Sequence, residues 1–211
     1  MTELAVDAQN LARRYGRRWA LIDVSFRVAA GSVLAVTGRN GSGKSTLLRT
    51  LATAIKPDAG RATVLGFDLV RDRYDVRKAV ALLSHSTYLY EQLTARENLD
   101  IAARFLGVGG VGDALARVNL AGRAGDAVAT FSAGMRKRLS FARVLLQSPR
   151  IALLDEPYGQ LDPEGFALVD EVVRELKRRG TTVLMATHQI ERGKQLADDA
   201  LCLEAGRVVP C

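Results

Sequence analysis

The segment Val33-Leu-Ala-Val-Thr-Gly-Arg-Asn-Gly-Ser-Gly-Lys-Ser45 decides the fold class. Its first five residues form a short apolar run, which is typical of a buried strand. Its last eight residues match the pattern G-x-x-x-x-G-K-[ST], at the start of a predicted helix. A strand, a glycine-rich loop and a helix in this order predict a cradle for a chain of phosphates, because the backbone N–H groups of the loop and the N-terminus of the helix face the same anion. The alternative is a glycine-rich turn that binds nothing.

Two side chains of this cradle have predicted chemical roles. Lys44 should reach the β- and γ-phosphates of a nucleotide and take part in catalysis, and the Ser45 hydroxyl should ligate Mg²⁺. The predicted nucleotide contacts in this segment are Gly38, Arg39, Asn40, Gly41, Ser42, Gly43, Lys44, Ser45 and Thr46.

Two carboxylates end a second apolar run. Ile151-Ala-Leu-Leu154 is followed by Asp155, Glu156 and Pro157. Burying adjacent carboxylates is unfavourable unless a cation or a reaction requires them. With a phosphate cradle on another strand, we expect Asp155 to hold the Mg²⁺ shell and Glu156 to orient or deprotonate an attacking water. Taken alone, Leu-Asp-Glu-Pro is more typical of a surface turn.

A third segment combines a serine, a glycine and three cations. Phe131-Ser-Ala-Gly-Met135 precedes a predicted helix whose first turn carries the cations Arg136 to Arg138. Cations at this end oppose the helix dipole, and nearby anions would relieve that conflict. Ser132 and the N–H group of Gly134 can both donate to a γ-phosphate. The alternative is a serine N-cap on a solvated basic helix.

Short apolar runs alternate with longer amphipathic segments, which is the pattern of an α/β sheet with helices on its faces. Strands of a more antiparallel opening region are predicted at Leu4 to Leu11 and Ile22 to Val28, and buried strands at Val33 to Thr37, Ile151 to Leu154 and Thr182 to Ala186. Helices are predicted at Lys44 to Ala54, Ala95 to Leu106, Met135 to Gln147, Pro163 to Arg179 and Gln189 to Ala197. We expect one domain over residues 1–211, with a helical subdomain at roughly 95–147 inserted into the α/β core and Gly107 to Gly112 as a loop between helices.

Composition excludes several classes of protein. With 211 residues, 48% of them hydrophobic and 25% charged, the chain suits one globular domain rather than a disordered or fibrous protein. The longest stretch without Asp, Glu, Lys or Arg, Ala79 to Tyr90, is too short to cross a bilayer, which takes ~20 residues. Met1 to Gln9 lacks the long apolar core of a secretory signal, and we therefore expect Cys202 and Cys211 to be reduced thiols. A net charge of +7 fits a polyanionic partner, which can be nucleic acid, nucleotide or an anionic membrane surface.

Five motifs occur in the order and spacing of ATP-binding cassette (ABC) ATPases, which the sequence resembles over nearly its whole length. They are the phosphate loop, Ser132-Ala-Gly134, Leu153-Leu-Asp-Glu-Pro157, Leu161-Asp162 and Thr187-His188. The resemblance implies ATP and Mg²⁺ as cofactors. It also implies a P-loop core of RecA type, with an N-terminal antiparallel β region and an inserted helical subdomain.

The resemblance assigns roles to further residues. Phe131 to Met135 would be a variant of the family signature Leu-Ser-Gly-Gly-Gln, and Tyr15 would stack on adenine. His188 would be the switch histidine, whose imidazole can hydrogen-bond the γ-phosphate during catalysis. Asp162 matches the loop that couples two active sites across a dimer. His85 stands where the family has a lid glutamine that senses Mg²⁺, and a histidine there can bond a water or ligate the metal weakly.

In this family two copies pack head to tail, and each nucleotide lies between the phosphate loop of one copy and the signature of the other, which suits a homodimer. The resemblance therefore implies an ATP-hydrolysing subunit, peripheral at the cytoplasmic face of the inner membrane, that powers membrane-spanning subunits on separate chains. Compact length, Ser-Ala-Gly in the signature and Ser84-His85 resemble the cytochrome c maturation (haem exporter) ATPases in particular.

Two alternatives remain at this point. ATPases of drug, polysaccharide or lipid exporters share several of these motifs, and Met135-Arg-Lys-Arg138 resembles that group. A soluble ABC ATPase that acts on nucleic acid or ribosomes belongs to a different class. The sequence has one phosphate loop and no heptad run, so no stable nucleic-acid partner is expected.

Overall fold

Two β-sheets form the framework of the structure, a computed structural model that describes residues 3–211. The first sheet has the order β2-β1-β4-β5 and is antiparallel, with β1 Leu4–Tyr15, β2 Arg18–Ala29, β4 Ala59–Val64 and β5 Phe67–Asp68. The second has the order β10-β9-β3-β8-β7-β6, with β3 Val33–Thr37, β6 Val80–Leu83, β7 Ile151–Asp155, β8 Thr182–Ala186, β9 Asp199–Glu204 and β10 Arg207–Val209. All its pairings are parallel except that of β9 with β10.

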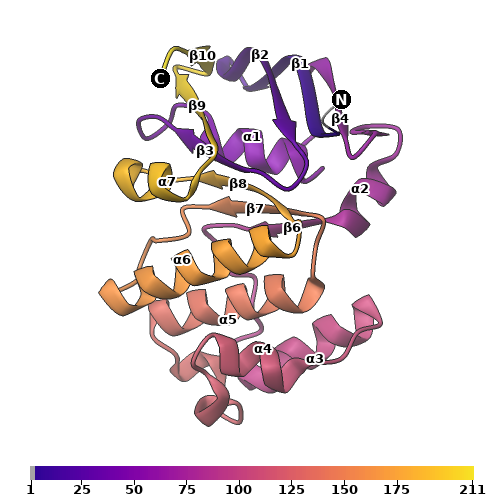
Figure 1. Cartoon of the computed structure of the whole chain (residues 1–211). Helices are drawn as coiled ribbons and strands as arrows, with labels where there is room; N and C mark the ends of the chain where they lie inside the picture. Colours follow the sequence, from indigo (N-terminus) through magenta and orange to yellow (C-terminus); the bar gives the residue numbers. More distant parts are fainter. Residues whose placement is uncertain (1–2) are drawn as a thin grey trace.

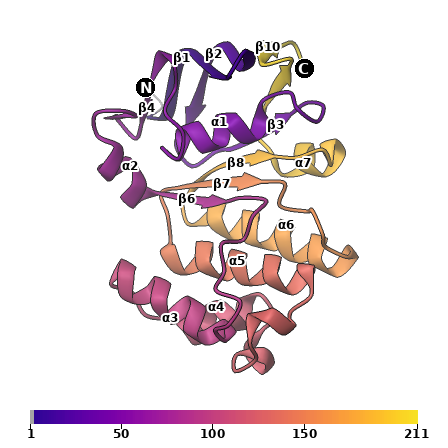
Figure 2. The same ribbon diagram turned by 180° about the vertical axis from the view of Figure 1, so that it is seen from behind.

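The helices cover both faces of the second sheet. Their bounds are α1 Lys44–Leu51, α2 Arg73–Ala79, α3 Ala95–Leu106, α4 Val111–Arg117, α5 Ala133–Gln147, α6 Pro163–Arg178 and α7 Ile190–Leu196. As Figures 1 and 2 show, α1 lies between the two sheets, while α5 and α6 cover the opposite face of the second sheet. Helices α3 and α4 form an outer layer beyond α5. The molecule is therefore layered, with the second sheet in its middle.

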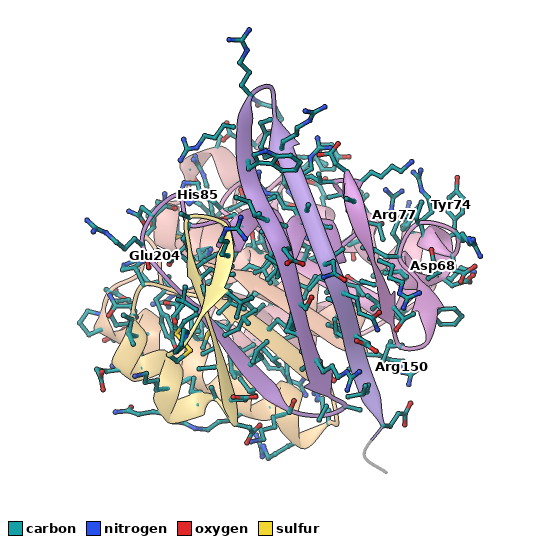
Figure 3. All side chains as sticks on the ribbon, turned by 90° about the horizontal axis from the view of Figure 1, so that it is seen from above. Asp68, Tyr74, Arg77, His85, Arg150 and Glu204 are labelled. Carbon is teal, nitrogen blue, oxygen red and sulfur yellow. A yellow bond between two sulfur atoms is a disulfide. The ribbon has the colours of Figure 1, made fainter. Side chains whose placement is uncertain are left out.

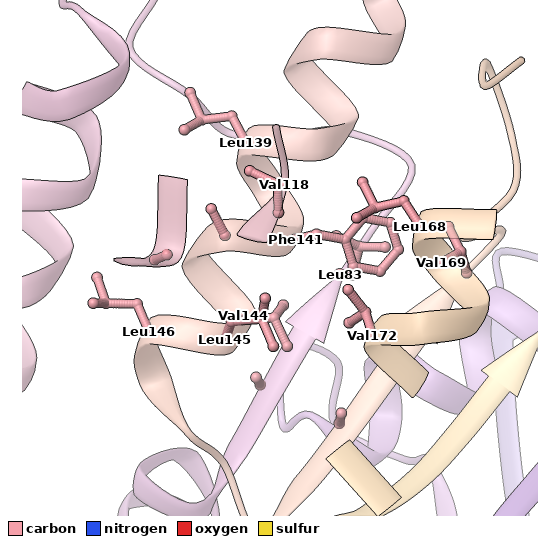
Figure 4. Packing of buried hydrophobic residues seen from close by; sticks show 14 of the residues in the cluster. Leu83, Val118, Leu139, Phe141, Val144, Leu145, Leu146, Leu168, Val169 and Val172 are labelled. Carbon is pink, nitrogen blue, oxygen red and sulfur yellow. The ribbon is translucent and has the colours of Figure 1, made fainter. Parts of the chain in front are cut away.

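This layering explains the continuous apolar runs of the central strands. All residues of β3, β7 and β8 are buried, as expected for parallel strands with helices or another sheet on both faces. On the side of α5 and α6, the core contains Phe141, Val144 and Leu145 of α5 packed with Leu168 and Val172 of α6 (Figure 4). Helix α6 begins at Pro163, where the Asp162 carboxylate accepts a hydrogen bond from the Gly165 N–H group at 2.8 Å.

The predicted α/β fold class is confirmed, and most predicted elements are present with small changes of their bounds. The opening strands run longer than predicted, as β1 and β2, and they are antiparallel. Elements β4, β5, α2, β6, α4, β9 and β10 were not predicted, because these short segments carry too few residues for a clear period. The predicted loop Gly107 to Gly112 is in part wrong, since α4 begins at Val111 after the left-handed residue Gly110 (φ 90°).

The expectation of reduced thiols is wrong. Cys202 and Cys211 form a disulfide, drawn in Figure 3. Cys202 lies in β9 and Cys211 follows β10, and the antiparallel pairing of these two strands folds the chain back on itself. The two Cα atoms are therefore 5.2 Å apart, a separation that a disulfide spans.

Within residues 3–211, no helix combines the length and the apolar character that crossing a bilayer requires.

Two phenylalanines on neighbouring helices give a matched test of the core. Phe141→Ala removes a ring with 0% exposure and should lower the free energy of unfolding by about 3–5 kcal/mol, because it leaves a cavity between α5 and α6. Phe105→Ala removes a ring with 92% exposure and should change it by less than about 0.5 kcal/mol. Urea denaturation followed by circular dichroism measures both, and equal losses in the two variants would contradict this packing.

Candidate active site

The carboxyl ends of four parallel strands bring the predicted motifs to one edge of the second sheet. β3, β8, β7 and β6 are neighbours in that order. The phosphate loop follows β3, His188 lies two residues after β8, Asp155 ends β7, and His85 lies two residues after β6. Because parallel strands end at the same edge, residues from distant parts of the sequence lie together there.

Two glycines of the phosphate loop lie where a larger residue does not fit. Gly38 has φ 142°, and a Cβ atom there would lie 2.2 Å from the carbonyl oxygen of Leu203 in β9. Gly43 has φ 110°, and a Cβ atom there would lie 2.4 Å from the carbonyl oxygen of Ala20 in β2. The turn between β9 and β10 also donates a backbone hydrogen bond to the Ser42 carbonyl at 3.0 Å. Both sheets therefore support the loop and require glycine at these two positions.

Lys44 is buried within the curve of this loop, with 5% exposure. Its ammonium group donates to the Gly38 carbonyl at 2.8 Å and to the Arg39 carbonyl at 3.3 Å. The same nitrogen lies 4.0 Å from Oε1 of Glu156. The predicted phosphate-binding cation and the predicted base are therefore neighbours.

The two predicted magnesium ligands are in direct contact. The Ser45 hydroxyl, in the first turn of α1, donates to Oδ1 of Asp155 at 2.8 Å. Asp155 has 1% exposure. A hydroxyl and a carboxylate are the hard oxygen donors that Mg²⁺ prefers, and this metal commonly takes one or two protein ligands and completes its shell with phosphates and water. Within residues 3–211, no cluster of three or more His, Cys, Asp or Glu side chains forms an all-protein metal site. The donor set fits a nucleotide-bound Mg²⁺.

Glu156 and His188 form a pair on adjacent strands. Oε2 of Glu156 lies 2.7 Å from Nδ1 of His188 and accepts a hydrogen bond from the His188 N–H group at 3.3 Å. Glu156 has φ 48°, a left-handed conformation that costs ~1 kcal/mol or more for a residue with a side chain. A backbone hydrogen bond to the Ala186 carbonyl at 2.9 Å holds it there. The carboxylate can thus accept a proton from water while the imidazole orients it.

A partly buried network of polar side chains fixes the position of the helix that follows His188. Arg192, in α7, donates to Asp170 of α6 at 2.7 Å, and the hydroxyl of the buried Tyr158 donates to the other oxygen of Asp170 at 2.8 Å. The Arg192 guanidinium also lies 5.9 Å from the centre of the Tyr158 ring. Burial and the neighbouring Asp170 carboxylate raise the pKa of Tyr158 far above its usual value, so this hydroxyl remains a donor. α7 is thereby attached to α6 shortly after His188 in the chain.

A cavity of about 510 Å³ opens between the phosphate loop and the first sheet. It is lined by Tyr15, Arg18, Ala20, Asn40, Gly41, Gly43, Lys44, Ser45, Thr46 and Glu156. The Tyr15 ring is 48% exposed at its mouth, where an adenine can stack on it. Gly38, Arg39 and Ser42, the remaining predicted loop contacts, lie in the same loop but do not line the cavity.

Arg18 is a lining residue that the sequence analysis did not select. Its guanidinium covers the loop so closely that a Cβ atom on Gly41 would lie 3.3 Å from Nη2 of Arg18. In the sequence it is one of four arginines near Tyr15, and nothing in that run distinguishes it from its neighbours. Only the course of β2 in the fold places Arg18, and not its neighbours, against the phosphate loop.

Ser132 and Gly134 do not line this cavity. Ser132 is the N-cap of α5, and its hydroxyl accepts a hydrogen bond from the Met135 N–H group at 3.2 Å. This bears out the N-cap interpretation of Ser132 and leaves the residue exposed. Arg138 lies 3.5 Å from Asp162, so the predicted signature and the predicted coupling loop are neighbours. Ser132 is therefore exposed and separate from the cavity of its own chain.

His85, labelled in Figure 3, follows β6 and is exposed. β6 pairs with β7 through Leu83 and Leu154, which places His85 near the strand end that carries Asp155. Within residues 3–211 its side chain makes no hydrogen bond and does not line the cavity. Its role toward Mg²⁺ stays a prediction.

Lys137 is a second residue that sequence reasoning did not select. It has 3% exposure, whereas its neighbours Arg136 and Arg138 are only partly buried. Burial lowers the pKa of Lys137 to about 8, and the carboxylates of Asp155 and Glu156 act in the opposite direction. The three cations look equivalent in the sequence, and packing of α5 against β7 distinguishes this one.

Substitutions of two neighbouring arginines test whether the cavity binds ATP. Arg18→Gln should weaken ATP binding about three- to tenfold, because the variant loses a cation beside the phosphate loop. Arg17→Gln removes an exposed arginine that does not line the cavity and should stay within about twofold of the wild type. Isothermal titration calorimetry at constant salt measures both, and equal effects of the two changes would show that only the overall charge matters.

Comparisons with known proteins identify the family. The family model for ABC transporters matches residues 21–159. The daunorubicin resistance ATP-binding protein DrrA3 of Streptomyces coeruleorubidus is 41% identical over 99% of this chain and 68% of its own length. A Nod factor export ATP-binding protein I of Rhizobium etli is 33% identical over 97% of this chain and 67% of its own length.

Solved structures agree. The ATP-binding subunit of an ABC transporter is 28% identical and superposes with a TM-score of 0.88 over 97% of this chain and 88% of that one. An ATP-binding cassette solved as a dimer in a post-hydrolysis state with ADP and Pi shares the fold, with 24% identity and a TM-score of 0.89 over 97% of both chains. The chain belongs to the ABC transporter family, as an ATP-binding subunit with the ATPase activity of that family.

Proposed function

We propose that the chain is the ATP-hydrolysing subunit of an exporter for an amphiphilic organic compound, such as a drug or a lipid-linked saccharide. The relatives named for daunorubicin resistance and Nod factor export support this proposal, and so does Met135-Arg-Lys-Arg138, which resembles the same export group. These relatives favour the drug, polysaccharide or lipid exporters over the haem exporter of cytochrome c maturation, which the sequence analysis preferred.

The contacts of the site support a hydrolytic mechanism. The phosphate loop and Lys44 would bind the triphosphate, and Tyr15 the base. Ser45 and Asp155 would hold Mg²⁺, which neutralises charge on the phosphates when bound. Glu156 orients a water for attack on the γ-phosphorus and accepts its proton as the bond to the β-phosphate oxygen breaks, and His188 holds the Glu156 carboxylate in place. The products are ADP and phosphate.

The proposal includes a second copy of the chain. Ser132 is exposed, Gly134 is half-buried, and both lie outside the cavity of their own chain, so they would complete the site of a partner copy around the γ-phosphate. Removal of that phosphate would then open the dimer. We infer further that residues 1–211 act as one nucleotide-binding domain, peripheral at the cytoplasmic face of the membrane, with the spanning helices on separate chains.

Glu156→Gln tests the dimer. The variant keeps Lys44 and the phosphate loop but loses the base. ATP should therefore remain bound without hydrolysis, and a dimer of the chain should accumulate. Light scattering after gel filtration with Mg²⁺ and ATP should show twice the monomer mass, and the same sample with ADP only the monomer. Adding Ser132→Ala to this variant should reduce the dimer, because the contact across the interface is lost. A monomer with ATP bound to Glu156→Gln would contradict the proposal.

Export itself is tested in a drug-sensitive host. The chain expressed together with the membrane proteins encoded beside it should lower the accumulation of daunorubicin or of a fluorescent lipid-linked saccharide, and Lys44→Ala should abolish the effect. Purification from detergent-treated membranes should yield those membrane chains. Recovery of ribosomes or nucleic acid, lost at moderate salt, would favour the soluble class instead.

A further inference from the structure

A buried ammonium group lies behind the acid pair and takes no part in the mechanism above. Lys137 has 3% exposure, and its Nζ donates to the backbone carbonyl of Asp155 at 3.5 Å. The two neighbouring cations point elsewhere: Arg136 donates to the Ala129 carbonyl at 3.2 Å, and Arg138 lies beside Asp162. Lysine is almost never fully buried unless its charge is compensated.

The compensation comes from the two acids. The carboxylates of Asp155 and Glu156 stabilise the charged form of Lys137 against the cost of its burial. Asp155 is itself buried, with 1% exposure, and needs positive charge nearby for the same reason. Lysine and acid pair therefore stabilise each other.

Lys137 reaches the acids from the side opposite to the nucleotide. Ser45 belongs to α1 and Lys137 to α5, and these two helices lie on opposite faces of the second sheet (Figures 1 and 2). Lys137 does not line the nucleotide cavity. A cation held by Ser45 and Asp155 would thus interact with the same acid pair as Lys137, from the other side of the sheet and without contact with Lys137.

We propose that Lys137 is a positioning residue, the internal counter-charge of Asp155 and Glu156. Its positive charge competes with the metal for these two carboxylates. Metal binding at the site is thereby coupled to the position of α5, which carries Ser132 at its N-terminus. Two like charges near one acid pair weaken each other's hold on it. Such coupling is reciprocal. Because Lys137 weakens the binding of the metal, the bound metal must in turn weaken the interaction of the acids with Lys137. The consequence for Ser132 rests on the proposed function, in which that residue acts on the nucleotide of a partner copy.

The sign of the effect on metal affinity tests the proposal. Mn²⁺ replaces Mg²⁺, with a non-hydrolysable ATP analogue at saturation, and free Mn²⁺ is measured by electron paramagnetic resonance. Lys137→Met, of similar length and without charge, should bind Mn²⁺ about three- to tenfold more tightly, because a repelling charge is removed. Lys137→Arg keeps the charge and should stay within about twofold. Lys78→Met, which removes an exposed lysine of α2, should not change Mn²⁺ affinity.

A merely structural role predicts the opposite result. A distorted site would bind Mn²⁺ more weakly, so unchanged or weaker binding by a folded neutral variant overturns the proposal. Should Lys137→Met not fold, Lys137→Gln provides the same test, because its amide keeps a donor for the Asp155 carbonyl without the charge. Circular dichroism establishes which variants are folded.

A second measurement separates this inference from the proposed function. In the Glu156→Gln background with ATP, Lys137→Met should form the dimer at a lower Mg²⁺ concentration, because the variant binds the metal more tightly and α5 is already released from Asp155. An unchanged or higher Mg²⁺ requirement for the dimer would overturn the link to Ser132. If Glu156→Gln alone forms no dimer, the proposed function fails, while the Mn²⁺ result still decides the counter-charge.

Discussion

Parallel pairing of β3, β8 and β7 is the constraint on which the nucleotide site depends. It brings the phosphate loop, His188 and the Asp155–Glu156 pair to one edge, where Ser45 reaches Asp155 at 2.8 Å and Glu156 reaches His188 at 2.7 Å. Asp155 is the last residue of β7, so a shift of this strand by one residue would turn its carboxylate to the other face of the sheet, away from Ser45.

A lysine lies near each of the two acids, Asp155 and Glu156. Lys44 approaches Glu156 from the phosphate loop, and Lys137 approaches Asp155 from α5. Lys44 donates to two backbone carbonyls and Lys137 to one, which limits the cost of burying them. The site is thus arranged for an anionic substrate with a divalent cation, and its own charges are balanced within the chain.

In our proposal, two surfaces of the chain take part in nucleotide binding. One is the cavity with Tyr15, Arg18 and the phosphate loop, and the other is the exposed N-terminus of α5 with Ser132. The Arg138–Asp162 contact joins the second surface to the segment that follows the acid pair. In our proposal, hydrolysis in one copy changes the position of the signature of the same copy. Because that signature contacts the nucleotide of the partner, the change also affects the partner's site.

The sequence by itself determined the α/β class, the central strands and the local motifs around Lys44 and Asp155, because a buried strand and a phosphate loop each have a pattern within a few adjacent residues. The resemblance of the motifs placed the chain in the ABC family, which the comparisons show, while the roles of the single site residues stay predictions. Only the tertiary structure decided which of several similar residues matter: Lys137 among three cations of α5, Arg18 among the arginines near Tyr15, and the pairing of Cys202 with Cys211. Burial, direction and proximity of these side chains depend on strands and helices distant in the sequence, and no local pattern records them.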